Sequence, residues 1–472
     1  MGLDIALKDA MTGLRATQAQ IQVISANIAN AQTPGYSEQT ITQTPIRMPA
    51  GGAGVQTSII QRISDQLLTT TLARQSSASA GASTTNNYMQ QLQSLFGQVG
   101  SGTTFTDAYN NFVGAMQAES ATPEDPVAQS AAVNAGQQLA QQLNQFSKGV
   151  QSLRANADSD INTAVNSLNT ALGQIASLNG SIAQVKAEGQ STATLQDQRD
   201  QALNQVAQLI GVTSYQRPDG SMVVLAASGQ TLIDGTSVST FGYTPSGVVT
   251  AGSPLSNVTL DGQNITSSIK SGQIGSLLQL RDTTLPAVTA EMNQFTNNLF
   301  NLTTNGNLAT TNSGTNATND ANHFFANVNI ATGLDNASTI QVNPSLTANA
   351  SLLYNGTSGV DPTIASSMAT ALTSNTIFAA AGNFPSSMTT TLSNYAAQIV
   401  GQAATAATNA TQNNTYQSQL TTQMQNRLQA ETGVNLDQEL GNLTVYQNAY
   451  GASAHVISTI QSMYDALMQI TN

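Results

Sequence analysis

Few residues of this chain could support acid–base, nucleophilic or metal chemistry. His323 and His455 are the only histidines, and neither lies in a His-Glu-x-x-His arrangement that would hold zinc beside a general base. The chain has no Cys, which excludes disulfides, thiolate metal sites and cysteine nucleophiles. Ser and Thr hydroxyls without a placed His or Lys base do not make a nucleophilic site. We therefore expect no enzyme activity, no cofactor and no metal site.

Two glycine-rich segments, 51–54 and 97–102, could resemble phosphate-binding loops. Neither is followed by the Gly-Lys-Ser/Thr sequence that supplies the phosphate-binding lysine and the metal-binding hydroxyl. We interpret both segments as turns.

The composition excludes further classes of function. Charged residues make up 8% of the chain, against about 25% in an average globular protein. The net charge is -12 and there are only 13 Lys and Arg, so we expect no binding to nucleic acid phosphates. The first residues alternate apolar with charged side chains, unlike a secretory signal, and no apolar run reaches the 18 residues of a membrane span. With 40% hydrophobic residues, we expect a folded protein that does not insert into membranes.

Two small groups of polar residues have two interpretations each. Asp197, Arg199 and Asp200 could form an interface network, or they could be local ion pairs on an exposed helix. Asn27 and Asn30 could set helix register as a buried Asn does in coiled coils, or they could lie on an exposed face. The sequence leaves both pairs of alternatives open.

The two ends of the chain have the clearest helical pattern. Apolar residues recur at alternating steps of three and four from Leu7 to Ile28, which is typical of a coiled-coil seam. Pro34 ends this helix, and Gly35 can adopt the positive φ of a chain reversal. A second amphipathic segment covers residues 436–470. We expect the terminal helices to pair with each other and with neighbouring subunits through Leu7, Leu14, Ile21, Ile24, Ile28, Leu443, Tyr446, Tyr450, Ile457, Ile460, Tyr464 and Leu467.

The central part of the chain is predicted to be mostly helical. A seven-residue apolar repeat over 161–185 is typical of a long helix packed against neighbours. The pattern predicts further helices over residues 59–72, 88–96, 107–118 and 387–428.

A β-rich segment is predicted between residues 212 and 272. Asp-Gly pairs at 219–220, 234–235 and 261–262 separate short runs that are typical of strands. Ile330 and residues 339–342 are candidates to complete this sheet, and a helix over 273–302 interrupts it. Residues 303–322 are rich in Asn, Thr and Gly, and we expect a surface loop there.

These elements predict a mainly α fold with an inserted β-rich domain. It has paired N- and C-terminal coiled-coil helices, an elongated helical bundle and an outer β domain. We expect three domains, formed by residues 1–36 with 433–472, by 37–211 with 360–432, and by 212–359 with its helical segment near 273–302.

Residues 25–37 resemble the Ala-Asn-Asn-Ile-Ala-Asn-x-x-Thr-Pro-Gly-Tyr signature of bacterial flagellar rod, hook and hook-associated proteins. Three further blocks, 121–128, 195–201 and 432–443, are similar to the hook-associated protein 1 family. The resemblance covers roughly residues 1–210 and 420–472. The signature is carried by Asn27, Asn30, Thr33, Pro34, Gly35 and Tyr36.

The resemblance implies a structural subunit of the flagellum outside the cell, at the junction between hook and filament. It implies that the terminal helices form an inner tube. The implied partners are the hook protein, the next hook-associated protein and further copies of this chain in a ring. It also implies type III export in an unfolded state and a cytoplasmic export chaperone that binds near the C-terminus.

Two alternative functions remain at this point. The chain could be a hook or rod subunit, although the repeat over 161–185 and the block 432–443 argue against it. It could instead be a secreted adhesin that binds glycans through its Thr- and Asn-rich surface, in which case the isolated 212–360 region would retain binding.

Overall fold

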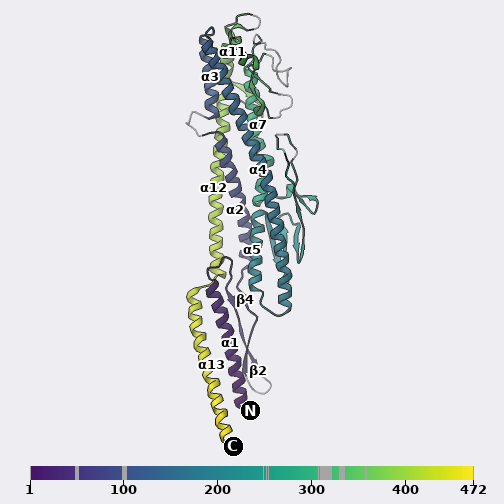
Figure 1. Cartoon of the computed structure of the whole chain (residues 1–472), viewed down its shortest axis with the longest axis vertical. Helices are drawn as coiled ribbons and strands as arrows, with labels where there is room; N and C mark the ends of the chain where they lie inside the picture. Colours follow the sequence, from purple (N-terminus) through teal and green to yellow (C-terminus); the bar gives the residue numbers. More distant parts are fainter. Residues whose placement is uncertain are drawn as a thin grey trace.

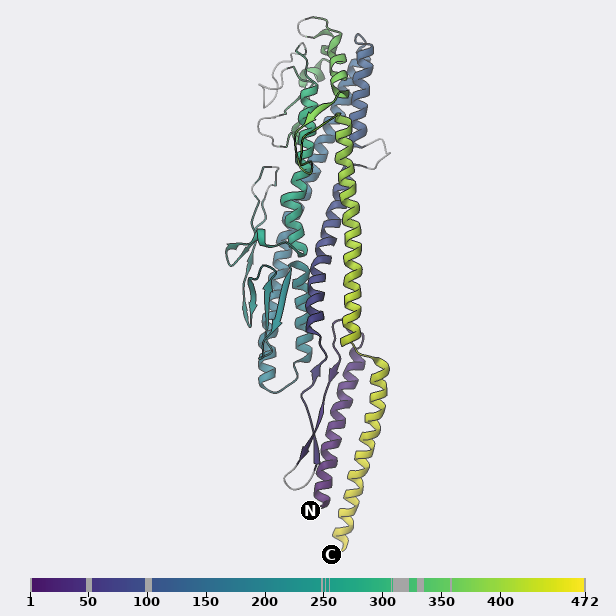
Figure 2. The same ribbon diagram turned by 180° about the vertical axis from the view of Figure 1, so that it is seen from behind.

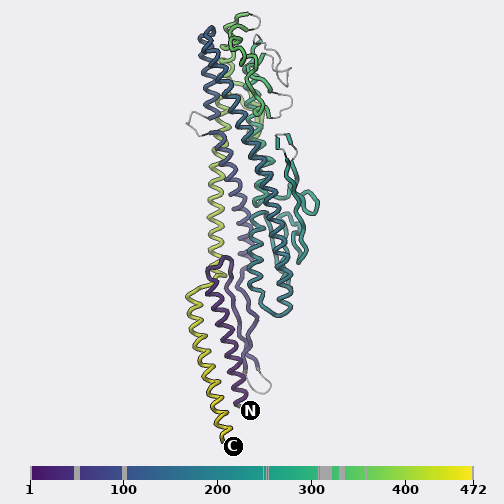
Figure 3. Tube along the Cα trace, in the orientation of Figure 1, coloured from purple at the N-terminus to yellow at the C-terminus, as the bar shows by residue number. Residues whose placement is uncertain are grey.

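The computed structural model is an elongated, mainly helical molecule with both chain ends at one tip (Figures 1 and 2). A pair of terminal helices forms this tip, and a longer helical rod extends from it, as the chain path in Figure 3 shows. No helix in the described ranges is both long enough and apolar enough to cross a membrane. The structure describes residues 2–470 except 48–52, 98–103, 248, 251, 254, 307, 309–321, 329–334, 357 and 358.

The terminal helices are α1 (Gly2–Asn30) and α13 (Leu436–Ile470), and they pack against each other. They run in opposite directions, so the first and last residues lie close to the same end (Figure 1). The preceding rod helix ends at Thr432, and the N–H of Gly433 donates to the carbonyl of Gln429 at 2.8 Å. Gly433 therefore lies between this helix and α13.

An extended arm follows α1 and packs beside it. The prediction of a helix starting at residue 59 is wrong, because α2 (Gln66–Leu95) begins only after Asp65, whose side chain accepts the N–H of Leu68 at 2.9 Å. This is an ordinary N-cap. The arm contains two antiparallel pairs, β1 (Gln39–Thr40) with β4 (Gln61–Arg62) and β2 (Gln43–Arg47) with β3 (Ala53–Thr57).

The helix α2 is continuous where the sequence pattern predicts two separate helices. The residues between the two predicted segments are mostly small, and they allow α2 to pack closely against α6 (Gly272–Gln279) and α12 (Leu392–Thr432). At Gly81, an added Cβ would lie 2.8 Å from the Ser276 Oγ atom of α6. The apolar periodicity is weak in such a segment because Ala, Ser and Gly replace large side chains at the contact.

The longest element is α4 (Pro126–Ala187), which has 62 residues and contains the predicted helix over 161–185. It begins where the Asp125 side chain accepts the N–H of Val127 at 2.9 Å, with Pro126 in the first turn. At 1.5 Å per residue this helix is about 90 Å long and runs along the whole rod (Figure 1).

Three more helices complete the body of the rod and pack along α2 and α4. The helix predicted over 387–428 is displaced, because residues 388–390 form the strand β15 and the helix starts after the Thr391 cap. These helices are α3 (Phe105–Ala121), α5 (Ala193–Leu209) and α12 (Leu392–Thr432).

The β-rich segment lies along the side of α4 rather than at an end of the rod (Figures 1 and 2). The three predicted Asp-Gly turns are confirmed, since each joins two paired strands. One sheet has the order β5 (Val212–Gln216), β6 (Met222–Ala226), β7 (Thr231–Asp234), β8 (Ser237–Val238). A second sheet contains β9 (Phe241–Gly242), β10 (Thr259–Leu260) and β11 (Gln263–Asn264), and the turn η1 (Thr266–Ser268) follows it.

The predicted helix over 273–302 is confirmed as α6 (Gly272–Gln279), a π-helical turn η2 (Leu280–Thr284) and α7 (Leu285–Leu302). The prediction that residues 339–342 complete the β-rich segment is wrong. They contribute β13 (Gln341–Val342), which pairs with β12 (Phe325–Ala326) in a separate sheet. Ile330 and most of the predicted loop over 303–322 lie outside the described residues.

Short elements fill the far end of the rod. They are α8 (Asn336–Thr339), α9 (Pro344–Ala348), α10 (Leu352–Asn355), α11 (Thr363–Thr373), β14 (Thr376–Phe378) and β15 (Met388–Thr390).

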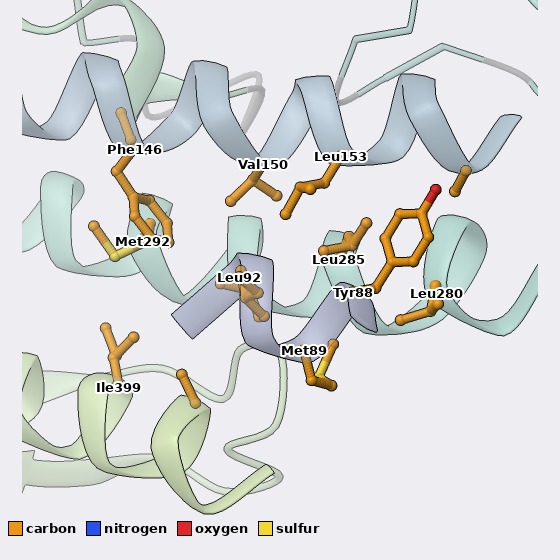
Figure 4. Packing of buried hydrophobic residues seen from close by; sticks show 14 of the residues in the cluster. Tyr88, Met89, Leu92, Phe146, Val150, Leu153, Leu280, Leu285, Met292 and Ile399 are labelled. Carbon is orange, nitrogen blue, oxygen red and sulfur yellow. The ribbon is translucent and has the colours of Figure 1, made fainter. Parts of the chain in front are cut away.

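A single cluster of buried apolar side chains runs through the rod and includes residues of the β-rich segment and of α7. Figure 4 shows Leu92 of α2, Phe146 of α4, Met292 of α7 and Ile399 of α12 converging on it. Burying one such side chain contributes about 1.5–3 kcal/mol, so these contacts dominate the stability of the rod. The predicted fold class, mainly α with a β-rich insertion and paired terminal helices, is confirmed.

Candidate assembly surfaces and the joint between them

The helices α1 and α13 pack against each other, but only two of the predicted seam residues on them are fully buried. Ile24 is 4% exposed and Ile460 is 5% exposed. Three seam residues of α13 stay exposed: Tyr450, Tyr464 and Leu467. The other seam residues are half-buried: Leu7, Leu14, Ile21, Ile28, Leu443, Tyr446 and Ile457. Two helices alone therefore cover their shared seam incompletely.

Two buried apolar residues of α1 were missed by the seam prediction. Ala16 and Val23 are 2% and 3% exposed, and α1 packs against β3 of the arm as well as against α13. The N–H of Val55 in β3 donates to the Thr12 hydroxyl at 3.2 Å. The arm buries a second face of α1, which the seam periodicity did not reveal.

A second apolar stripe on α13 has no partner among the described residues. Val445, Val456 and Met463 are 63%, 48% and 50% exposed. Together with two exposed alanines they recur at steps of four, three, four and seven residues, so they lie on one helix face. We call this surface the free seam, formed by Val445, Ala449, Ala452, Val456 and Met463.

The free seam was absent from the sequence prediction, although its spacing was present in the sequence. It follows the same seven-residue repeat as the seam toward α1, displaced by one residue at Val456 and Met463. A helix with two such stripes can pack against two partners at once. One partner is α1, and the other position is open in the protomer.

Between the terminal pair and the rod lies a polar cluster that we call the joint, formed by Asn27, Tyr36, Ser37, Arg62, Asp197 and Glu439. Asn27 is fully buried, so its interpretation as part of an exposed face is wrong. Its Nδ2 donates to the Gln39 carbonyl at 2.9 Å and to Glu439 Oε1 at 3.0 Å. Its Oδ1 accepts the Gln39 N–H at 3.0 Å and the Tyr36 hydroxyl at 2.9 Å. One side chain thus ties α1 to the arm and to α13, in a fixed register.

The Thr-Pro-Gly segment of the signature forms the exposed turn that leads into the joint. The N–H of Thr33 donates to the Asn30 carbonyl at 2.8 Å, and Gly35 has a φ of 76°. This left-handed conformation favours glycine. The Gln201 side chain of α5 donates to the Pro34 carbonyl at 2.7 Å, which fixes the turn against the rod.

Asn30 differs from Asn27 in its contacts. Its Nδ2 donates to the Ala26 carbonyl one turn earlier at 2.9 Å, and its Oδ1 accepts the Thr33 hydroxyl at 3.3 Å. Asn30 therefore stabilises the end of α1 locally, without reaching α13.

Arg62 of the arm binds the start of α5 through a charged cluster. Its guanidinium donates to Asp197 at 2.8 Å, to Asp200 at 2.6 Å and to Gln196 at 3.0 Å. The Ser37 hydroxyl donates to Asp197 at 2.9 Å from the other side. The side chains of Arg62 and Asp197 are 10% and 6% exposed. The alternative of local ion pairs on an exposed helix is therefore wrong for Asp197 and Asp200, which hold the arm on the rod.

Arg199 serves a different contact on the opposite side of α5. It is 1% exposed and donates to Asn179 of α4 at 3.1 Å and to the Gly220 carbonyl at 2.7 Å. Burial lowers the pKa of Arg199 because it penalises the charged form. This side chain joins α5, α4 and the first hairpin of the β-rich segment.

Burial and the acidic groups of the joint shift the ionisation of Tyr36 and of the neighbouring Glu38. Burial, followed by the charges of Asp197, Glu439 and Glu38, raises the pKa of Tyr36 to about 12. Burial and the nearby Glu439 also raise the pKa of Glu38. A carboxyl whose pKa rises on folding favours the folded state at low pH and disfavours it as pH rises.

The two histidines have different surroundings. His323 stacks on Phe300 with ring centroids 3.8 Å apart, and His455 is exposed on α13. Within the described ranges, no three His, Cys, Asp or Glu side chains gather as metal ligands. A shallow groove of about 850 Å³ along α12 is lined by small and amide side chains such as Asn394, Gln398 and Gly401, and its described lining contains no ionisable group.

Three parts of this chain match models of known protein families. Residues 89–323 match the family model described as the helical domain of flagellar hook-associated protein FlgK. Residues 7–36 match the model for flagella basal body rod proteins, and residues 424–470 match the C-terminal model of flagellar basal body rod FlgEFG proteins.

Curated relatives from several bacteria carry the name flagellar hook-associated protein 1. The Salmonella typhimurium protein is 29% identical over 289 residues, which cover 58% of this chain and 51% of the relative. The Bacillus subtilis protein is 26% identical over 240 residues, covering 48% of this chain and 47% of the relative. The chain thus spans about half the length of the curated relatives it matches. A solved structure of the flagellar hook junction protein FlgK from Burkholderia pseudomallei is 25% identical, with a TM-score of 0.46 over 54% of this chain and 46% of that one.

Proposed function

We propose that this chain, which belongs to the flagellar hook-associated protein 1 family, is a structural subunit at the junction between the hook and the filament of a bacterial flagellum. It acts outside the cell, by packing and not by catalysis. The observation that carries the proposal is the free seam of α13, which leaves Val445, Val456 and Met463 exposed on a helix already paired with α1.

The proposed mechanism is the burial of this seam against the terminal helices of neighbouring copies. Each large apolar side chain that becomes buried contributes about 1.5–3 kcal/mol. The incompletely covered residues between α1 and α13, such as Tyr450 and Tyr464, would be covered in the same step. Paired terminal helices gain most of their stability from such contacts, so assembly and ordering of the tip are coupled.

The proposed partners are further copies of this chain, the hook protein and the next hook-associated protein. Before assembly, the apolar side chains of the free seam would have to be shielded from solvent. A cytoplasmic export chaperone that binds near the C-terminus would shield them. This requirement follows from exposed apolar side chains, which favour association in an unassembled subunit.

The proposed domain division assigns residues 1–36 with 433–472 to the tube of subunits, 37–211 with 360–432 to the rod around it, and 212–359 to an outer part. What supports it is the position of the joint, which lies where the arm and Thr432 leave the rod. The seam and signature residues keep their proposed roles in assembly, together with the free seam.

A second candidate is a hook or rod subunit. It is favoured by the matches of residues 7–36 and 424–470 to rod protein models. Deleting the gene and imaging the cells by electron microscopy separates the two functions. We expect complete hooks without filaments, and filament protein in the medium. Truncated rods would indicate a rod subunit, and normal flagella would refute both functions.

The free seam is tested by complementing the deletion with Val456→Lys. A charge in the middle of the seam should prevent filament assembly without changing the fold of the purified protein. The matched control is Gln461→Lys, which places the same charge on an exposed position of α13 outside the seam. Filaments restored equally by both variants would show that the free seam is not an assembly surface.

A further inference from the structure

Glu119 is an acidic residue buried at the far end of the rod. It lies in the last turn of α3 and is 0% exposed. Neither Oε1 nor Oε2 has a hydrogen-bond partner among the described residues. A buried carboxylate without a donor or a cation strongly disfavours the folded state, because the charge loses its hydration without compensation.

The elements packed against α3 provide no positive charge to Glu119. α3 contacts α4, α11 and α12, and its aromatic side chains also contact α7 and residues 324–325. The ionisable residue of α7 is Glu291, which is acidic. His323 precedes the contact at Phe324, but its ring stacks on Phe300 and its Nδ1 lies 3.0 Å from the Phe300 carbonyl. α11 has no ionisable residue, and α4 has none between residues 126 and 147. On the first turns of α12 the only ionisable group is Tyr395, a phenol that is neutral at physiological pH, and burial and then Glu291 raise its pKa further.

The remaining groups near the end of α3 are also unfavourable for a negative charge. The turn after the helix carries Glu124 and Asp125, both acidic. The C-terminal end of a helix has a partial negative charge, which disfavours a carboxylate in the last turn. On α3 itself, Asp107 and Tyr109 lie at the opposite end of the helix.

We propose that the protonation state of Glu119 controls the stability of the far end of the rod. This region is stable while the carboxyl is protonated and becomes less stable when it ionises. This inference does not depend on the proposed function. The region concerned is the hairpin formed by α3 and the start of α4, with α11 packed against it.

The direction of the effect follows from proton linkage. Burial raises the pKa of Glu119 from 4.5 to about 7. The folded state therefore binds the proton more tightly than the unfolded state, and stability falls as pH rises between these two values. Between pH 5.5 and pH 8 the unfolding equilibrium constant should increase by roughly 30-fold through this residue alone.

The test is denaturant unfolding of the full chain between pH 5.5 and pH 8 for the wild type and Glu119→Gln. We expect the roughly 30-fold increase in the wild type to disappear in the variant. Glu124→Gln is the control, because it removes an exposed carboxyl only five residues away and should keep the wild-type pH dependence. An unchanged pH dependence in Glu119→Gln overturns the proposal.

A second variant keeps the test decisive if the buried carboxamide prevents folding. Glu119→Met has a similar length and no ionisable or polar group, so it should fold and show the same loss of pH dependence. Hydrogen exchange in the wild type gives an independent result. After correction for the intrinsic pH effect, amides in the last turns of α3 should open more readily at pH 8 than at pH 5.5, while those of α5 should not. Equal behaviour of α3 and α5 would contradict the assignment.

Discussion

Replacing Arg62 by alanine tests the idea that the joint is held by its charged cluster. The guanidinium makes three hydrogen bonds to α5, at 2.8, 2.6 and 3.0 Å, and only 10% of the side chain is exposed. Burial alone would lower the pKa of Arg62, but Asp200 and Asp197 outweigh it and raise the pKa. Removing the cation leaves Asp197, at 6% exposure, without a positive partner. Breaking a buried ion pair in this way costs about 3–5 kcal/mol, and Asp200 at 22% exposure reduces the figure, so we expect about 3 kcal/mol.

Hydrogen exchange measures this loss where it occurs. The N–H of Ile63 donates to the Glu38 carbonyl at 2.8 Å beside Arg62, so its protection reports the attachment of the arm. A loss of about 3 kcal/mol corresponds to roughly 100-fold faster exchange of this amide in Arg62→Ala.

The control is Arg217→Ala, which removes the exposed pair with Asp234, whose side chains are 40% and 48% exposed. It should leave exchange at Ile63 unchanged and stability nearly unchanged. In a second check, Arg62→Met with Asp197→Asn should recover part of the loss, because the more deeply buried of the two carboxylates is removed with the cation. If Arg62→Ala leaves exchange at Ile63 unchanged, the charged cluster does not hold the arm.

Two further substitutions test the uncharged part of the joint. Asn27→Ala removes the contacts to the arm and to Glu439 and should cost about 2–4 kcal/mol, seen as faster exchange in the first turns of α13, whereas Asn30→Ala should affect only the end of α1. Gly35→Ala combines a φ of 76° with a Cβ placed 2.4 Å from the Gln201 amide, while Gly189→Ala has a φ of 72° and no atom within 4 Å of the added Cβ. Both should lower the melting temperature, Gly35→Ala more, and equal shifts would show that the contact with Gln201 is unimportant.

The sequence predicts much of this fold because its long helices repeat every seven residues. The repeat over 161–185 and the seam from Leu7 to Ile28 are both long enough to exclude strands, and the Asp-Gly pairs locate the turns of the β-rich segment. The sequence predicts two separate helices in place of α2, because the centre of α2 consists mostly of small side chains, for which hydrophobic periodicity is weak.

The arm was misassigned for a different reason. Ile59 and Ile63 are four residues apart, as on a helix face, yet both are exposed in the arm at 50% and 37%. Strand pairing between β1 and β4 depends on contacts distant in sequence, which local periodicity does not encode. The pairing of Arg62 with Asp197, 135 residues apart, was invisible for the same reason.

The sequence predicts only part of the joint. The two interpretations of Asn27 could not be separated from the sequence, because the buried one depends on Glu439 reaching α1 from the other end of the chain, 412 residues away. Nothing in the sequence indicated that Glu119 is buried. It lies beside apolar residues of α3, and a carboxyl at a helix end is ordinarily expected on the surface.

The length of α4 has a mechanical consequence. A straight helix of about 90 Å is a lever arm, and a change of 5° in its direction at the joint would displace the far end by about 8 Å. The arm and the Asn27 contacts therefore have to fix the angle between the rod and the terminal helices, in addition to holding the two parts together. A subunit with a loosened joint would keep its fold and still misplace its outer end by several ångströms, so angular precision is a separate requirement from stability.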